Sequence, residues 1–222
     1  MSLSKESQAR EDICRIGKSL FDRGYVHATA GNISVKLDDG FLTTPTDACM
    51  GFLDPAKLAK LDNNAKQTSG DIASKTIALH AVIYSATAAL NTSAGCVVHT
   101  HSTSCVALSL QATGAELLAA LTPYFVMKVG RVPVISYHRP GSPAAALEVA
   151  RIIGQYGERG TPIRAVMLPR LGPTVWAASP FEAMAVLEEL VETARLACLQ
   201  PGAMPITEAQ IDELRQTFGA VW

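Results

Sequence analysis

Two histidines at the end of an apolar run are the strongest chemical signal in this sequence. The run Cys96-Val97-Val98-His99-Thr100-His101-Ser102 places His99 and His101 two positions apart. On a β-strand, this spacing brings both imidazoles to one face of the sheet. Two neutral imidazoles side by side are the start of a site for a divalent metal. The pattern is equally compatible with two histidines at a strand end that bond to backbone carbonyls or water.

The composition indicates a folded protein with a large core. The chain has 222 residues, of which 48% are hydrophobic and 18% are charged, and this excludes a disordered chain. Its net charge of -1 argues against a nucleic-acid or membrane-surface partner, because either would call for a basic patch. No stretch reaches the roughly 20 apolar residues of a membrane span.

Cysteine usage and the first residues suggest a cytoplasmic location. The five cysteines are scattered, with no Cys-x-x-Cys pair, which is typical of reduced thiols. The polar start Met1–Glu6 lacks the apolar segment of a signal peptide.

Hydrophobic periodicity and capping signals predict one α/β domain over residues 1–222, without repeats or linkers. We expect helices at 4–22, 74–85, 142–152 and 179–199, another from Thr207, and a short one at Asp54-Pro55. We expect strands at 30–37, 41–44, 132–137, 163–168 and 174–177, and one that carries His99 and His101. The turn Asp38-Asp39-Gly40 joins the first two strands.

Several segments, taken in order, resemble the class II aldolase/adducin family over essentially the whole chain. These are Thr29-Ala30-Gly31-Asn32-Ile33-Ser34, Thr44-Pro45-Thr46, Ser74-Lys75 before Leu79-His80, Val97 to Ser102, and Val132 to Tyr137. The stretches Thr122 to Met127 and Tyr137 to Gly141 are most similar to the branch that decarboxylates 3-oxo-tetronate 4-phosphates.

The resemblance implies a three-layer α/β/α fold around a mostly antiparallel sheet. It also implies a homotetramer with sites between subunits and a small sugar or sugar-acid phosphate as substrate. In this family a zinc-type divalent ion, held by three histidines, polarises the substrate carbonyl while a carbon–carbon bond breaks, and a glutamate moves the proton. By position, His99 and His101 match two of the three ligands. The substrate and phosphate loops are matched by Gly31, Asn32, Thr46, Ser74 and Lys75.

Three matching positions depart from the family pattern. Thr76 occupies the place of the glutamate, and a hydroxyl cannot serve as a general base near neutral pH. Leu171 occupies the place of the third histidine and offers no lone pair. Asp47 follows Thr46 where the family has glycine, and its carboxylate would repel a phosphate. Because these positions differ from the family, no residue of this chain can be assigned a catalytic role by its match to the family pattern.

Other residues could stand in for the missing groups. His138 is a hypothetical replacement ligand, although a surface histidine at a strand end is the more ordinary interpretation. Tyr124 is a weak candidate for a contact with a neighbouring subunit's site. Arg139 and Arg170 could contact an anion or form ordinary surface ion pairs, and His80 is expected in the core.

Three functions follow from these observations. The first is a metal-dependent carbon–carbon lyase, of aldolase or decarboxylase type, whose activity is impaired or altered. The second is a non-catalytic binding or assembly member of the same fold. The third is an enzyme for a non-phosphorylated or cationic substrate, for which Asp47 would be the recognition charge.

Overall fold

The computed structural model describes residues 4–111 and 114–222, so the first three residues of the polar start lie outside it. The helices are α1 (Lys5–Asp22), α2 (Ile77–Ala89), α3 (Thr103–Gln111), α4 (Pro143–Glu158), α5 (Pro180–Leu199) and α6 (Glu208–Phe218). The strands are β1 (Asn32–Leu37), β2 (Gly40–Thr43), β3 (Ala59–Asp62), β4 (Gln67–Ser69), β5 (Cys96–His99), β6 (Ala165–Leu168) and β7 (Gly172–Ala177). Within this described part, no helix has the length and apolarity to span a membrane.

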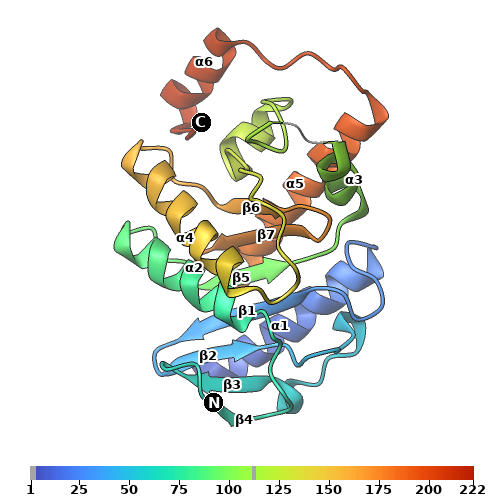
Figure 1. Ribbon diagram of the computed structural model, residues 1–222, viewed down its shortest axis with the longest axis vertical. Helices are drawn as coiled ribbons and strands as arrows, with labels where there is room; N and C mark the ends of the chain where they lie inside the picture. Colours follow the sequence, from blue (N-terminus) through green and yellow to red (C-terminus); the bar gives the residue numbers. More distant parts are fainter. Residues whose placement is uncertain (1–3, 112–113) are drawn as a thin grey trace.

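All seven strands form one antiparallel sheet in the order β4-β3-β2-β1-β5-β7-β6 (Figure 1). Strand β5 lies between β1 and β7, so it is hydrogen-bonded on both edges. In this register His99, the last residue of β5, is opposite Asn32 on one side and Thr174 on the other. The middle of the sheet therefore holds the first histidine of the pair in place.

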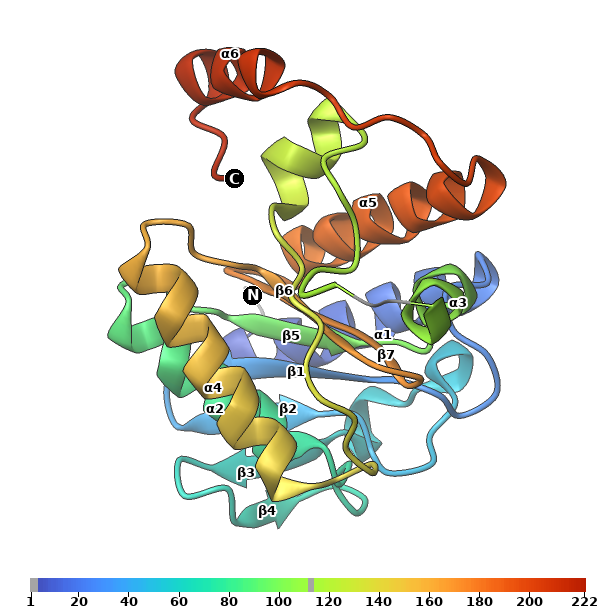
Figure 2. The ribbon, with the colours of Figure 1, turned by 45° about the horizontal axis from the view of Figure 1, so that its top comes forward.

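Helices cover both faces of the sheet, which confirms the predicted three-layer fold class (Figures 1 and 2). One core contains side chains of α1 and α5, such as Ile16 and Leu187, together with Val98. The other contains side chains of α2 and α4, such as Ile83, together with Val97. Neighbouring residues of β5 thus enter opposite cores, as the two-residue period of a strand requires. Because His99 shares the parity of Val97, it faces α2 and α4.

Helices α2 and α4 pack side by side and run in the same direction, so their N-terminal ends lie at the same end of the pair (Figure 2). Pro143 occupies the first turn of α4, as the sequence predicted, because its missing N–H is not needed there. Neither Thr76, before α2, nor Ser142, before α4, caps its helix through the side chain. Ile77, Leu79 and Ala145 donate their N–H groups to backbone carbonyls instead. Ala78 and Ala144 are therefore the first-turn residues whose N–H groups lack such a partner among the described residues.

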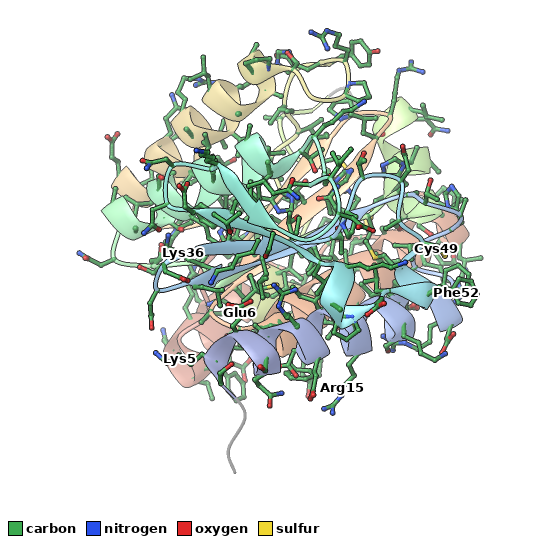
Figure 3. The ribbon with its side chains drawn as sticks, turned by 90° about the horizontal axis from the view of Figure 1, so that it is seen from below. Lys5, Glu6, Arg15, Lys36, Cys49 and Phe52 are labelled. Atoms are coloured by element: carbon green, nitrogen blue, oxygen red, sulfur yellow. The ribbon has the colours of Figure 1, made fainter. Side chains whose placement is uncertain are left out.

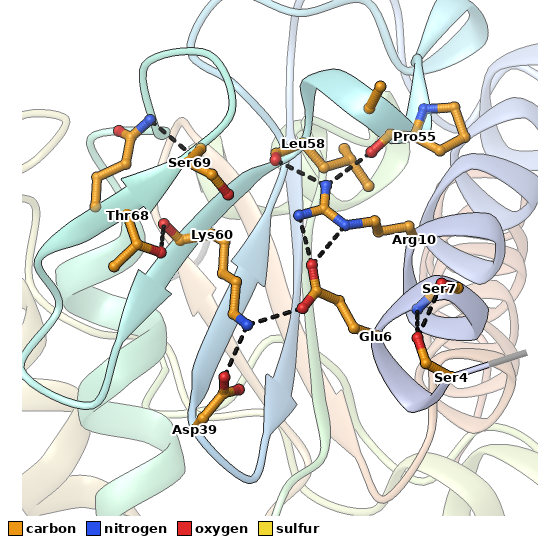
Figure 4. A network of polar contacts seen from close by, with 12 residues as sticks. Ser4, Glu6, Ser7, Arg10, Asp39, Pro55, Leu58, Lys60, Thr68 and Ser69 are labelled. Atoms are coloured by element: carbon orange, nitrogen blue, oxygen red, sulfur yellow. Dashed lines mark hydrogen bonds and ion pairs between the residues drawn. The ribbon is translucent and has the colours of Figure 1, made fainter.

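A network of hydrogen bonds and ion pairs joins α1 to strand β3 and to the segment before it (Figure 4). Glu6 accepts hydrogen bonds of 2.8 Å from Arg10 and Lys60, and Arg10 also donates to the carbonyl oxygens of Pro55 and Leu58. These contacts, Lys60 first, hold the pKa of Glu6 below its usual value. Farther along the same helix, Arg15 points into solvent on the underside of the molecule (Figure 3).

Two predicted strands need correction. Residues 132–137 do not form a strand but make isolated bridges, such as Val134 to Met167, because Pro133 has no N–H to donate to a ladder. Strand β5 ends at His99, so His101 lies beyond the strand and not on its face. The short strands β3 and β4 and helix α3 were not predicted.

A candidate active site at the ends of two helices

His99 and His101 line a cavity of about 140 Å³ beneath the N-terminal ends of α2 and α4. Several positions that the sequence singled out line the same cavity, namely Asn32, Lys75, Thr76, His138, Arg139 and Leu171. Together with the two histidines they come from five separate stretches of the chain, and the sheet and the α2–α4 pair bring them together. Thr76 and Leu171, which we predicted at the places of the base and the third ligand, thus line the same cavity as the histidine pair.

The imidazole of His99 is fixed by strand β7. Its Nδ1 lies 3.0 Å from the carbonyl oxygen of Pro173 and 3.0 Å from the hydroxyl of Thr174. Because a carbonyl oxygen only accepts, Nδ1 carries the proton and Nε2 keeps its lone pair. Burial, and next the neighbouring His101, lower the pKa of His99 to about 3, so the ring is neutral near pH 7. This is the state in which histidine binds a metal.

The two rings have the separation expected of a shared metal ion. Their centres are 5.1 Å apart. Two imidazoles bound to one tetrahedral zinc, with Zn–N bonds of about 2.0–2.1 Å, have ring centres roughly 5 Å apart. In residues 4–111 and 114–222, however, no three His, Cys, Asp or Glu side chains are placed to hold one ion. The donor set fits two ligands of such an ion and lacks the third.

The turn that carries Leu171, which we predicted at the place of the third ligand, packs closely against the histidine pair. Leu171 lies in the turn between β6 and β7 and packs against the core under α2 and α4. The next residue, Gly172, has φ +141°, and a Cβ there would lie 1.9 Å from the carbonyl oxygen of Thr100. This close approach presses the turn against the link between His99 and His101.

Of the residues predicted to bind substrate and phosphate, Asn32 and Lys75 line the cavity, whereas the loop with Thr46 and Asp47 does not. Thr46 donates its N–H to the carbonyl of Ile72, and Ser74 donates its own to Thr44, so two extended segments pair here. Thr46 and Asp47 line a separate hollow on the surface. Asp47 has φ +55°, which lies in the left-handed region that favours glycine. The backbone at this position could therefore accept glycine without a change of conformation.

Gly31, in contrast, is required by close packing. Its φ is +86°, and a Cβ would lie 2.6 Å from the carbonyl oxygen of His99. Ser74 does not line the cavity, but its hydroxyl lies 2.9 Å from that of Thr76. Tyr124 is 63% exposed and does not line the cavity.

His138 is held by a carboxylate. Its Nε2 lies 2.8 Å from Glu148, which also accepts from the backbone N–H and the hydroxyl of Ser136. In the described part of the chain it does not form a three-ligand group with His99 and His101. Its role as a replacement ligand therefore stays a prediction.

His80 belongs to the site, although the sequence suggested only a core residue. Its Nδ1 lies 2.7 Å from the hydroxyl of Ser34, which lies 2.7 Å from that of Tyr84. The other nitrogen, Nε2, is buried without a protein partner, and His80 lines the cavity. The signal in the sequence was its spacing: His80 follows Thr76 by four residues, and so lies one turn farther along the same side of α2.

The two buried histidines predict acid sensitivity of the metal-free protein. Burial lowers the pKa of His80 and of His99 from 6.5 to about 3, with a smaller contribution from a neighbouring histidine in each case. Below pH 6.5 these two histidines bind protons in the unfolded chain but stay neutral in the folded chain. The free energy of unfolding therefore falls as the pH falls from about 6.5 towards 3. The slope is at most roughly 1.4 kcal/mol per pH unit for each histidine.

Urea unfolding in EDTA between pH 7 and pH 4.5 measures this slope. We expect a shallower slope in the His99→Asn variant, whatever its stability at pH 7. An unchanged slope would show that His99 does not carry the effect.

Comparison with known proteins identifies the class to which this fold and cavity belong. A family described as "Class II Aldolase and Adducin N-terminal domain" matches residues 11–198. The chain therefore belongs to the class II aldolase/adducin family, as the sequence segments predicted.

Relatives in the family point to one branch. The chain is 49% identical to a 3-oxo-tetronate 4-phosphate decarboxylase of Cupriavidus necator, over 99% of this chain and 100% of that protein. It is 39% identical to a protein of the same name from Escherichia coli, over 95% and 96% of the two chains. The crystal structure of YgbL from Escherichia coli, a putative aldolase/epimerase/decarboxylase, superposes with a TM-score of 0.84 at 35% identity, covering 96% and 100%.

Proposed function

We propose that this protein is a divalent-metal-dependent lyase of the decarboxylase type, acting on a small sugar-acid phosphate with slow turnover. The observation that carries the proposal is the fixed imidazole of His99. Its Nε2 lone pair is free, and its ring lies beside that of His101 at the distance of a shared ion. The relatives named as decarboxylases of 3-oxo-tetronate 4-phosphate support the choice of substrate class.

The residue at position 76 favours decarboxylation over aldol cleavage. Aldol cleavage begins with removal of a hydroxyl proton, and Thr76 cannot take that proton as a carboxylate would. Loss of CO₂ from a 3-oxo acid needs no base, because the electron pair of the breaking carbon–carbon bond passes to the oxo group. A proton then returns to carbon from water or a nearby acid. The reaction that tolerates Thr76 best is therefore decarboxylation.

The remaining residues bind and orient. His99 and His101 would hold a divalent ion, which would supply polarisation of the oxo group. Lys75 and Asn32 line the cavity and would hold the phosphate end of the substrate. The apolar side of Leu171 would limit the access of water to the reacting carbon.

A second candidate is a non-catalytic binding member of the family. The observation that favours it is that Thr76 and Leu171 line the same cavity as the histidine pair, and no third ligand is placed there in the described residues. Recognition of a cationic substrate by Asp47 is less well supported, because Asp47 lines a different hollow.

The first experiment measures metal content and CO₂ release together. We expect about one zinc or similar ion per chain after incubation with the metal, and slow, EDTA-sensitive CO₂ release from 3-oxo-tetronate 4-phosphate. The variant His99→Ala should lose the ion and at least tenfold in rate, since it removes a ligand. The matched control is Arg15→Ala, at an exposed position of α1 that does not line the cavity.

Each result separates the candidates. Bound metal without CO₂ release would favour the non-catalytic member. If the protein binds no metal and releases no CO₂, the proposed lyase is contradicted. The histidine pair would then be a remnant of a metal site.

Assembly and location belong to the same proposal. We propose a homotetramer, which would cover large exposed apolar side chains such as Phe52, Ile72 and Leu147. We also propose a cytoplasmic location, supported by cysteines that are all free thiols.

A further inference from the structure

The cavity has an unbalanced set of charges. The basic side chains of Lys75 and Arg139 line it together with the histidines. No aspartate or glutamate is among the described residues that line it. The nearby carboxylate of Glu148 is engaged by His138 and Ser136. A cavity of this kind attracts anions and offers them no competing carboxylate.

Two helix ends add to this positive potential. Helices α2 and α4, of 13 and 16 residues, lie side by side (Figure 2), and residues of both first turns line the cavity. The side chains of Thr76 and Ser142 do not cap them, and in the described residues the N–H groups of Ala78 and Ala144 have no backbone partner. A helix N-terminus carries roughly half a positive charge and binds carboxylates and phosphates readily. Each helix end is paired with its own cation, Lys75 before α2 and Arg139 before α4.

Buried polar atoms with no protein partner point to a ligand in this cavity. The Nε2 atom of His80 and the Oδ1 atom of Asn32 are both buried and unpartnered, and both residues line the cavity. When Tyr84 donates to Ser34, and Ser34 donates to Nδ1 of His80, the proton of His80 lies on Nε2. An unpaired buried donor is costly, and an oxyanion in the cavity would satisfy it.

We infer that the cavity holds two anionic groups of one ligand, with a carboxylate subsite formed by Arg139 and the first turn of α4. This inference rests on the proposed function and deepens it, since Lys75 and the start of α2 would hold the phosphate of the same molecule. Packed helices lie roughly 8–10 Å apart. A four-carbon sugar acid with a phosphate at its other end is long enough to reach both helix ends. Arg139 is thus a specificity-determining residue, which distinguishes a sugar-acid phosphate from a neutral sugar phosphate.

Binding of two matched probes tests the inference without turnover. Erythronate 4-phosphate and erythritol 4-phosphate differ only in having a carboxylate or a hydroxymethyl group at carbon 1. By titration calorimetry, the protein should bind erythronate 4-phosphate at least ~10-fold more tightly than erythritol 4-phosphate. One charge-assisted hydrogen bond contributes about this much to affinity. Arg139→Gln should reduce that preference to within about twofold and leave the affinity for erythritol 4-phosphate unchanged. Arg15→Gln, an equal loss of charge at an exposed position of α1, is the control that should keep the preference.

The outcomes are distinct. Equal binding of both probes by the unmodified protein, or a preference that survives Arg139→Gln, would overturn the carboxylate subsite and leave the proposed substrate class standing. Binding of neither probe would contradict the proposed phosphate substrate itself, and the subsite with it. Thermal unfolding of each variant shows whether the fold is retained, and Arg139→Lys provides a second variant that keeps the charge.

Discussion

Placing glutamate at position 76 and histidine at position 171 should raise the rate of CO₂ release from 3-oxo-tetronate 4-phosphate by about 10²-fold or more. Both positions line the cavity that holds His99 and His101. Leu171→His would supply a third imidazole to the ion that we propose His99 and His101 hold, and Thr76→Glu would supply a group that can move a proton. A general acid–base residue typically contributes about 10²–10⁴ in rate.

Steady-state CO₂ release and metal affinity of the double variant test this prediction. We expect Leu171→His alone to tighten metal binding, and Thr76→Glu alone to act mainly on rate. The double variant Thr76→Gln, Leu171→Phe is the matched control, because it adds similar bulk without a carboxylate or an imidazole. A rate no higher than that of the control would show that these two positions do not complete the site in this chain.

The variant Gly172→Ala should lose at least about 3 kcal/mol of stability. The methyl group would lie 1.9 Å from the carbonyl oxygen of Thr100, and the backbone at Gly172 has φ +141°. Two backbone segments must move apart to relieve this contact, and one of them joins His99 to His101. We therefore expect a fall in Tm of about 6–12 °C and weaker metal binding than in the parent chain.

Calorimetric unfolding of Gly172→Ala and Gly154→Ala measures the effect. Gly154 lies inside α4, and a Cβ there meets no atom within 4 Å. Alanine is the better helix former, so this control should gain about 0.5–1 kcal/mol. Equal stability of the two variants would contradict the close approach of the β6–β7 turn to Thr100.

Local signals in the sequence predicted the framework well. Prolines and caps at Pro143, Pro180 and Thr207 correctly marked the starts of three helices, because these residues act through their nearest neighbours. The segment 132–137 failed for the opposite reason. Its apolar composition resembles a strand, but Pro133 removes a donor, and the segment makes only isolated bridges to Glu116 and to Met167 of β6.

The site could be predicted in part. The histidine pair and its two altered neighbours, Thr76 and Leu171, were identified by position in the sequence, and the fold places them around one cavity. For Arg139 the sequence left an anion contact and a surface ion pair open, and for His80 it suggested only a core position, because the choice depends on tertiary packing. Arg139 reaches the cavity only because α4 packs along α2, and the free nitrogen of His80 is apparent only once Ser34 is seen to occupy the other.

The left-handed backbone of Asp47 bears on how this protein could change over evolution. A loop that already has the shape suited to glycine needs no refolding to accept one, and an aspartate codon becomes a glycine codon by a single base change. Substitution in either direction would switch the charge of the hollow beside the cavity and leave its walls in place. Selection can therefore act on ligand charge at this position at little cost in folding.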